Sequence, residues 1–166
     1  MALTKVQADG INLADTFAFS GTVSGTEANT PSFLASRTSS NQTITASTWT
    51  KIQFNDEIYD NGGVYDHATN YRFTPNVAGK YYCFCNINPN TATTHTYGSF
   101  YFNGTGHFPM QIADGSQSGG VTLVNTIIFN GSSDYLEAYT YQGTGAGRIE
   151  DSSQFNIFGA YRIIGA

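Results

Sequence analysis

The pattern of apolar and polar positions is that of short strands separated by turns, and no segment shows the 3.6-residue period of an amphipathic helix. Pairs such as Asn103-Gly104 and Asn130-Gly131 are strong turn signals between the runs. The runs predict strands near residues 33–36, 42–45, 49–54, 71–74, 80–86, 97–103, 121–129, 135–142 and 154–164. The pattern therefore predicts an all-β domain over residues 31–166.

Two of the predicted strands are apolar on both faces, whereas a sandwich strand with one solvent face alternates apolar with polar residues. In the strand 121–129, the apolar face that carries Ile127 and Phe129 is opposed by Val124 and Ile128. The strand 154–164 behaves similarly. A second cover must come from outside the subunit, so we expect an oligomer interface on the sheet that holds both strands. The alternative is that a loop or the N-terminal segment covers this face. The expected interface residues are Phe155, Ile157, Tyr161, Ile163, Ile127 and Phe129.

Residues 1–30 differ from the rest of the chain. The segment Phe17-Ala18-Phe19-Ser20-Gly21-Thr22-Val23-Ser24-Gly25 alternates weakly and is interrupted by glycine. It fits an extended arm, a strand added to a neighbour, or a flexible leader. Its sequence resembles the N-terminal segments of bacteriophage tail-fibre and virion proteins. The resemblance implies that residues 1–30 dock on other virion proteins.

Charge is scarce and acidic, with seven Lys and Arg against twelve Asp and Glu and a net charge of −5. The basic residues form no stripe, so we expect no nucleic-acid binding. No apolar run is long enough to cross a bilayer, so we expect no membrane insertion. Residues 1–5 lead into polar sequence rather than an apolar segment, so we expect no signal peptide.

Signals for catalysis are weak. His67, His95 and His107 are expected in loops and lack metal-ligand spacing. The glycine-rich segment 143–147 lies between predicted strands rather than before a helix, so it reads as a loop and not as a phosphate site. Cys83 and Cys85 are two residues apart in one strand, about 7 Å, which is too far for an easy disulfide. We expect two buried, reduced thiols and no enzyme activity; a glycosidase with two facing carboxylates is an alternative.

Acidic residues are concentrated at Asp56, Glu57, Asp60 and Asp66. Carboxylates at this density can hold Ca²⁺, especially if several subunits bring them together. Their spacing matches no defined calcium loop, and acidic loop residues usually cap turns. We therefore expect no cofactor, with calcium at Asp56, Asp60 and Asp66 as a weaker alternative.

The central block carries the most specific pattern: Asn61-Gly62-Gly63-Val64-Tyr65-Asp66, then Phe73-Thr74-Pro75, then Ala78-Gly79-Lys80-Tyr81-Tyr82. Together with Ser32-Phe33-Leu34-Ala35, Trp49–Phe54 and Phe158-Gly159, it resembles the globular head of complement subcomponent q, a jelly roll shared with tumour necrosis factor. The resemblance covers about residues 31–166. It implies a two-sheet antiparallel jelly-roll sandwich, and a homotrimer in which the sheet with the first and last strands packs around a threefold axis. The family's usual Gly-Asp appears here as Ser133-Asp134, and residues 1–30 contain no collagen-like Gly-X-Y run.

The strand 135–142 places Tyr135, Glu137, Tyr139 and Tyr141 on one face and Leu136, Ala138 and Thr140 on the other. The second set suits a core, so we expect the first set to point outward. By the family resemblance, this strand lies in the sheet away from the threefold axis. Exposed tyrosines beside an acid can bind a sugar, because ring faces stack on pyranoses. The alternatives are cross-strand pairing and contact with a neighbouring subunit.

The sequence predicts a homotrimeric jelly-roll domain on the surface of a bacteriophage virion, assembled in the bacterial cytoplasm. Its expected role is that of an adhesin that recognises a bacterial surface glycan or protein. The alternative is a structural virion component, such as a capsid decoration or head-fibre knob, without receptor binding. A secreted cytokine-like ligand fits less well, because neither a signal peptide nor a stalk is predicted.

Overall fold

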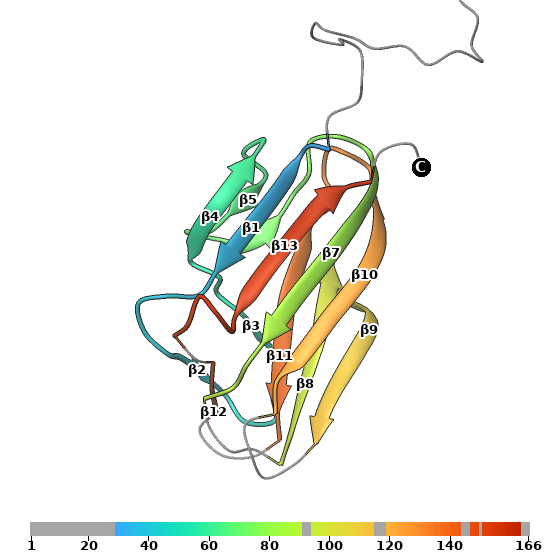
Figure 1. The fold of residues 1–166 in the computed structure, drawn as a ribbon. Helices are drawn as coiled ribbons and strands as arrows, with labels where there is room; N and C mark the ends of the chain where they lie inside the picture. Colours follow the sequence, from blue (N-terminus) through green and yellow to red (C-terminus); the bar gives the residue numbers. More distant parts are fainter. Residues whose placement is uncertain (1–28, 91–93, 115–118, 144–146, 150, 164–166) are drawn as a thin grey trace, which may run out of the picture.

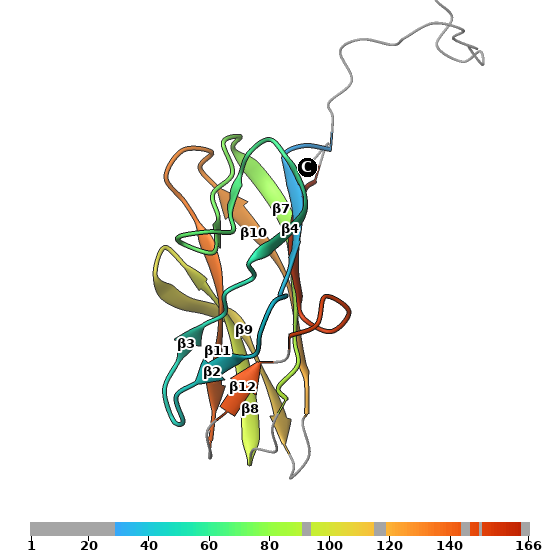
Figure 2. The same cartoon turned by 90° about the vertical axis from the view of Figure 1, so that its left-hand side faces the viewer.

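The computed structural model describes residues 29–90, 94–114, 119–143, 147–149 and 151–163. Within them, strands form two antiparallel sheets that pack face to face (Figure 1). Figure 2 shows the layers from the side, with β8 and β11 in one and β1 and β7 in the other. This confirms the predicted all-β jelly-roll sandwich. The described residues contain no helix that is long and apolar enough to span a membrane.

The five-stranded sheet brings the first and last strands of the domain together. Its spatial order is β10 (Val121–Phe129), β7 (Gly79–Ile87), β13 (Ile157–Arg162), β1 (Ser32–Ser36) and β4 (Asp56–Asn61). Leu34 of β1 lies opposite Gly159 of β13, which in turn lies opposite Phe84 of β7. The two strands that are apolar on both faces, β10 and β13, therefore share one sheet as expected, with β7 between them.

The six-stranded sheet has β11 at its centre. Its order is β5 (Tyr65–Asp66), β6 (Arg72–Phe73), β11 (Leu136–Gln142), β8 (His95–Phe102) and β9 (Thr105–Asp114), and β3 (Thr50–Lys51) also pairs with β11. A small separate ladder joins β2 (Gln42–Ile44) to β12 (Gly147–Ile149). Because β3 and β8 flank β11, side chains from three distant segments reach one outer surface.

Aromatic residues from both sheets form the centre of the core. The ring of Phe33 in β1 stacks on Tyr65 of β5 at 4.5 Å and on Phe73 of β6 at 4.8 Å. Phe158 of β13 meets Phe33 edge-on at 5.0 Å. Each ring removes a large apolar area from water, and these stacked and edge-on geometries are the favourable ones. The contacts fix the two sheets against each other.

Four strands escaped prediction. The edge strand β4 reads Asp-Glu-Ile-Tyr-Asp-Asn and carries charges, as edge strands often do. Strand β5 pairs only two residues with β6. Strand β9 follows the hairpin turn at Asn103 and Gly104, both of which have positive φ. Strand β12 includes Gly147, so the predicted loop 143–147 ends in a strand; residues 144–146 lie outside the described part.

The last strand is shorter than predicted. It begins at Ile157 rather than at residue 154 because a turn precedes it, in which the amides of Phe155 and Asn156 donate to the Ser152 carbonyl at 3.3 and 3.0 Å. The segment 49–54 likewise contributes only Thr50–Lys51 as a strand. The N-terminal segment 1–28 lies outside the described residues, so its role as a docking arm stays a prediction.

Candidate ligand-binding and assembly surfaces

Four aromatic side chains meet on the outer face of the six-stranded sheet and form what we call the aromatic pocket: Trp49, His95, Tyr97 and Tyr141. Tyr97 of β8 lies opposite Tyr141 of β11 in the ladder, and strand alternation turns both away from the core. Trp49 directly precedes β3, whose Thr50 pairs with Thr140. His95 begins β8. The pocket therefore depends on the pairing of β3 and β8 with the same central strand.

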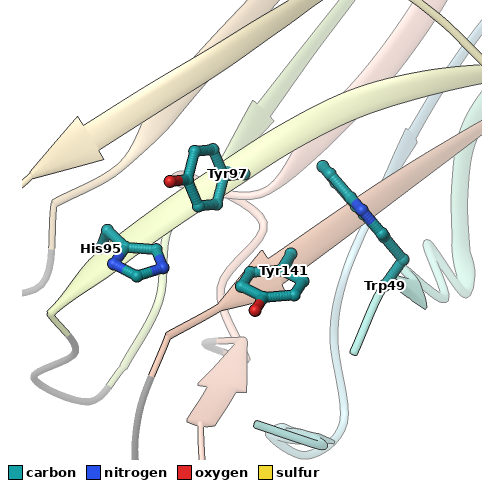
Figure 3. A pocket seen from close by; sticks show the side chains of 4 residues that line it. All are labelled: Trp49, His95, Tyr97 and Tyr141. Carbon is teal, nitrogen blue, oxygen red and sulfur yellow. The ribbon is translucent and has the colours of Figure 1, made fainter. Parts of the chain in front are cut away.

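The rings touch one another and enclose one side of a depression of about 300 Å³ (Figure 3). The centroids of Tyr97 and Tyr141 are 5.6 Å apart, with the rings inclined at 71°. His95 lies 4.8 Å from Tyr97, and Trp49 lies 5.7 Å from Tyr141. Figure 3 shows His95 and Trp49 on opposite sides of the two tyrosines. The rings form a half-buried aromatic surface that remains open to solvent.

Next to the pocket, two tyrosine rings stack on each other, so their facing sides are not available to a ligand. The rings of Tyr101 and Tyr139 stack at 3.9 Å with an angle of 23°. Burial first, and then the neighbouring Glu137, raises the pKa of Tyr139 to about 12. The Tyr139 hydroxyl donates to Glu137 Oε2 at 3.5 Å. This pair extends the aromatic surface from Trp49, whose ring lies 5.9 Å from that of Tyr101.

The sequence predicted Tyr135, Glu137, Tyr139 and Tyr141 as one exposed binding face. The structure places Glu137, Tyr139 and Tyr141 on the outer face of β11, and Tyr135 directly precedes this strand. Glu137, however, is only 5% exposed, so the prediction that it is exposed is wrong. Its Oε1 accepts a hydrogen bond of 2.8 Å from Lys51 Nζ of the neighbouring β3, which shields it from water. Of the four, only Tyr141 lines the aromatic pocket.

Sequence reasoning missed three pocket residues, although one signal for them was present. The predicted strand 97–103 has Tyr97 and Tyr101 on alternate positions, the same pattern that identified the face of Tyr141. The expectation that His95 and His107 lie in loops is wrong, because they belong to β8 and β9. His67 does lie in a turn, where its Nδ1 is 3.1 Å from Glu57 Oε2.

The second surface is the outer side of the five-stranded sheet. Large apolar side chains project from its neighbouring strands, and we call this set the outer apolar face: Tyr82 and Phe84 of β7, Val124 and Ile128 of β10, and Tyr161 of β13. Ile128 is 68% exposed and Val124 is 41% exposed. The rings of Tyr82 and Tyr161 lie 5.3 Å apart. The ring of Phe84 lies across Gly159, because a Cβ at position 159 would be only 2.5 Å from Phe84 Cζ.

The structure divides the predicted interface residues into two groups. Phe155 and Tyr161 are exposed, Ile157 and Ile163 are half-buried, and Phe155 lines a depression together with Asn86 and Thr122 of the outer side. Ile127 and Phe129 are 4% and 1% exposed. The structure corrects the prediction that these two residues lie at the interface. They belong to the inward face of β10, which packs into the core, whereas Val124 and Ile128 point outward.

The acidic residues cap turns and join strands. The Asp66 carboxylate accepts hydrogen bonds from the amides of Ala68, Thr69 and Asn70. Burial alone would raise the pKa of Asp66, but these hydrogen bonds outweigh it and lower the pKa. Asp56 accepts from Ser36 Oγ, and Asp60 from the Tyr65 amide, each at 2.8 Å. In the part of the chain that the structure describes, no three His, Cys, Asp or Glu residues converge as metal ligands.

No protein-family model matches the sequence, and no curated protein sequence is similar to it. Solved structures share its fold. Murine APRIL at pH 8.5 superposes with a TM-score of 0.60 at 9% identity, over 80% of this chain and 99% of that chain. The globular domain of the zebrafish complement 1qA protein gives 0.59 at 16% identity, over 80% and 96%. Eiger TNF from S. frugiperda gives 0.62 at 8% identity, over 81% and 93%. The likeness shows that the sandwich has the architecture of tumour-necrosis-factor and complement-q head domains.

Proposed function

We propose that this chain is the head domain of a homotrimeric bacteriophage adhesin, which recognises a glycan or a protein on the bacterial surface. The observation that carries this proposal is the separation of two unlike surfaces. The outer apolar face lies on the five-stranded sheet, whereas the aromatic pocket lies on the opposite sheet. One face can be buried by assembly while the other stays open to a ligand.

The outer apolar face supports self-association. Exposed apolar side chains that adjoin one another across neighbouring strands mark interaction surfaces more often than single ones do. Tyr82, Val124 and Ile128 belong to the sheet that contains β1 and β13. The resemblance to the complement-q head implies that this sheet faces a threefold axis. Three copies around it would cover the apolar side chains that one copy leaves in water.

The proposal that the protein belongs to a virion rests on the sequence resemblance of residues 17–25. It also rests on the expected arm over residues 1–30, through which the head would join other virion proteins. The free, buried cysteines fit assembly in a reducing bacterial cytoplasm. A weak site on each subunit would gain avidity from three linked copies, and again from several trimers on one particle. No covalent chemistry is required of the chain for this role.

A structural virion component without receptor binding is the second candidate. The observation that favours it is the tight stacking of Tyr101 on Tyr139, because rings that pair across strands stabilise a sheet without any ligand. In that case the aromatic side chains of the six-stranded sheet stabilise the pairing of β8 with β11 and bind no ligand.

Two measurements test the proposal. Light scattering of the full chain should give about three times the mass of one 17.9 kDa subunit, and a stable monomer would contradict the trimer. Fluorescently labelled protein should bind intact host cells and should compete with virions for adsorption. If the protein forms trimers and is found on virions, yet neither binds cells nor competes, the structural role is the correct one.

A further inference from the structure

We infer that the aromatic pocket binds an uncharged pyranose unit, such as a neutral hexose or an N-acetylhexosamine at the end of a surface glycan. The inference rests on the proposed function of a binding domain and names the class of its ligand. It follows from the arrangement of the rings, the size of the depression and the lack of charged groups in its described lining.

The arrangement of the rings favours a flat ligand. A cage for a quaternary ammonium group needs aromatic faces on several sides of the cation, each within about 6 Å of it. Here the rings are in contact with one another, since Tyr97 lies 5.6 Å from Tyr141 and 6.4 Å from Trp49. The rings are inclined to one another by 51 to 71°, so they form a wall of separate facets, and the C–H face of a pyranose can stack on one of them.

The polar groups of the wall suit hydroxyl partners. The two tyrosines each add a hydroxyl group that donates and accepts, and Trp49 adds an indole N–H donor. The depression of about 300 Å³ is at the lower end of the sizes of small-molecule sites, so it suits one sugar unit better than a long chain. An apolar wall edged with hydroxyl groups matches a molecule that has one apolar face and a polar rim.

The charged residues described around the pocket do not favour an ionic ligand. Among the described residues that line it, none is Lys, Arg, Asp or Glu. On this face the charged pair Lys51 and Glu137 is joined at 2.8 Å, and Arg72 lies over the ring of Tyr135 at 4.6 Å. A phosphate or carboxylate here would find hydroxyl and N–H donors and the His95 ring but no Lys or Arg, so the loss of its water would be poorly compensated. A neutral sugar carries no such cost.

The pocket contains the single tryptophan of the chain, which makes the test direct. The full-length protein is titrated with methyl glycosides and short oligosaccharides of neutral hexoses and N-acetylhexosamines, and with their uronic-acid and phosphorylated counterparts. We expect a saturable change in Trp49 fluorescence with at least one neutral sugar and none with its charged counterpart. Saturation only with charged sugars, or with no sugar in the panel, overturns the inference.

Two matched variants locate the site. Tyr141→Ala removes a ring of the wall, and it should weaken binding about tenfold, the factor expected for the loss of one stacked aromatic group. Tyr135→Ala removes a ring directly before the same strand and outside the pocket, and it should leave the affinity unchanged. Equal losses in both variants, with circular dichroism showing that both are folded, would contradict the assignment of the pocket.

Treatment of the host cells separates this inference from the proposed function. Periodate oxidises sugar diols, whereas a protease removes protein receptors. We expect cell binding to be lost after periodate and kept after protease. The opposite result would overturn the sugar ligand while leaving the adhesin role intact. A sugar that binds Trp49 in solution while untreated cells are not bound would support the pocket and overturn the adhesin.

Discussion

The two thiols of β7 are closed to solvent. Cys83 and Cys85 are both free and both 0% exposed, and burial raises the pKa of each thiol well above its ordinary value. Since only the thiolate is nucleophilic, these groups should be inert in the folded protein. We expect iodoacetamide at pH 8 to leave the native protein unmodified and to alkylate both residues in denaturant, as measured by mass spectrometry. Rapid alkylation of native protein would show that β7 opens to solvent.

Tyr139 links the aromatic surface to alkaline stability. Its pKa is raised from the ordinary 10 to about 12, chiefly by burial and then by Glu137, so folding favours the neutral phenol. The stabilisation that results is fully present below pH 10 and is lost as the pH rises towards 12. We expect the free energy of unfolding of the native protein to fall more steeply between pH 10 and 12 than that of Tyr139→Phe.

Urea denaturation at a series of pH values measures this difference, and the two proteins should have the same pH dependence between pH 7 and 9. Ultraviolet difference spectra of the two proteins should assign the missing high-pH transition to Tyr139. A phenol at position 139 that ionises near pH 10 in the folded protein would contradict the prediction.

At the scale of elements, the turn between β10 and β11 is held by its own residues. The Asn130 Oδ1 accepts hydrogen bonds from the amides of Ser132, Ser133 and Asp134 at 2.9, 3.0 and 3.1 Å. Gly131 has φ of 74°, and a Cβ there would overlap the backbone nitrogen of Ala78. The turn therefore packs backbone against backbone on the loop before β7.

A matched pair of substitutions tests this close approach. Gly63 also has positive φ, 62°, but a Cβ there would meet nothing within 4 Å. We expect Gly63→Ala to cost about 1 kcal/mol, which is the strain of its backbone conformation alone. Gly131→Ala should cost at least about 2 kcal/mol more, because backbone atoms must also move apart. Urea denaturation measures both, and equal costs would mean that the turn moves away from Ala78 freely.

Strands with many apolar residues were the ones that the sequence could identify. The strand 121–129 was predicted with its observed limits. Strands β4 and β12 were not predictable in this way, because β4 is polar at an edge and β12 consists of three residues beside a glycine-rich segment. The faces of β10 were assigned less well. Both are apolar, so the sequence alone could not tell that Ile127 points inward and Ile128 outward.

At the scale of the whole molecule, the aromatic pocket shows why a binding site is harder to predict than a fold. The alternation within β11 identified the face of Tyr141 but not its neighbours. Trp49 and His95 join it only because β3 and β8 flank β11, which is a matter of long-range pairing that no local pattern encodes. The same pairing brings Lys51 onto Glu137 and buries the carboxylate that the sequence placed in solvent.

At the scale of the whole molecule, we expect one introduced charge to prevent assembly of the trimer. Ile128 is 68% exposed at the outer apolar face, where we place the contact between copies. In Ile128→Glu, the contact would have to bury a carboxylate without a partner in each of three subunits, at a cost of several kcal/mol for the trimer. A single subunit would keep that carboxylate in water. We therefore expect light scattering to show a monomer of 17.9 kDa whose tryptophan fluorescence matches that of the native protein.

The control is Val77→Glu, which places the same charge on an apolar residue that is 37% exposed in the loop between β6 and β7, outside the outer apolar face. This variant should remain trimeric.

The monomeric Ile128→Glu should retain the intrinsic affinity of its pocket but lose most of its attachment to cells, because one weak site lacks the avidity of three. If Ile128→Glu remains trimeric, the contact between copies lies on another surface of the sandwich; if it is monomeric but attaches to cells as firmly as the native protein, avidity is not the basis of adhesion.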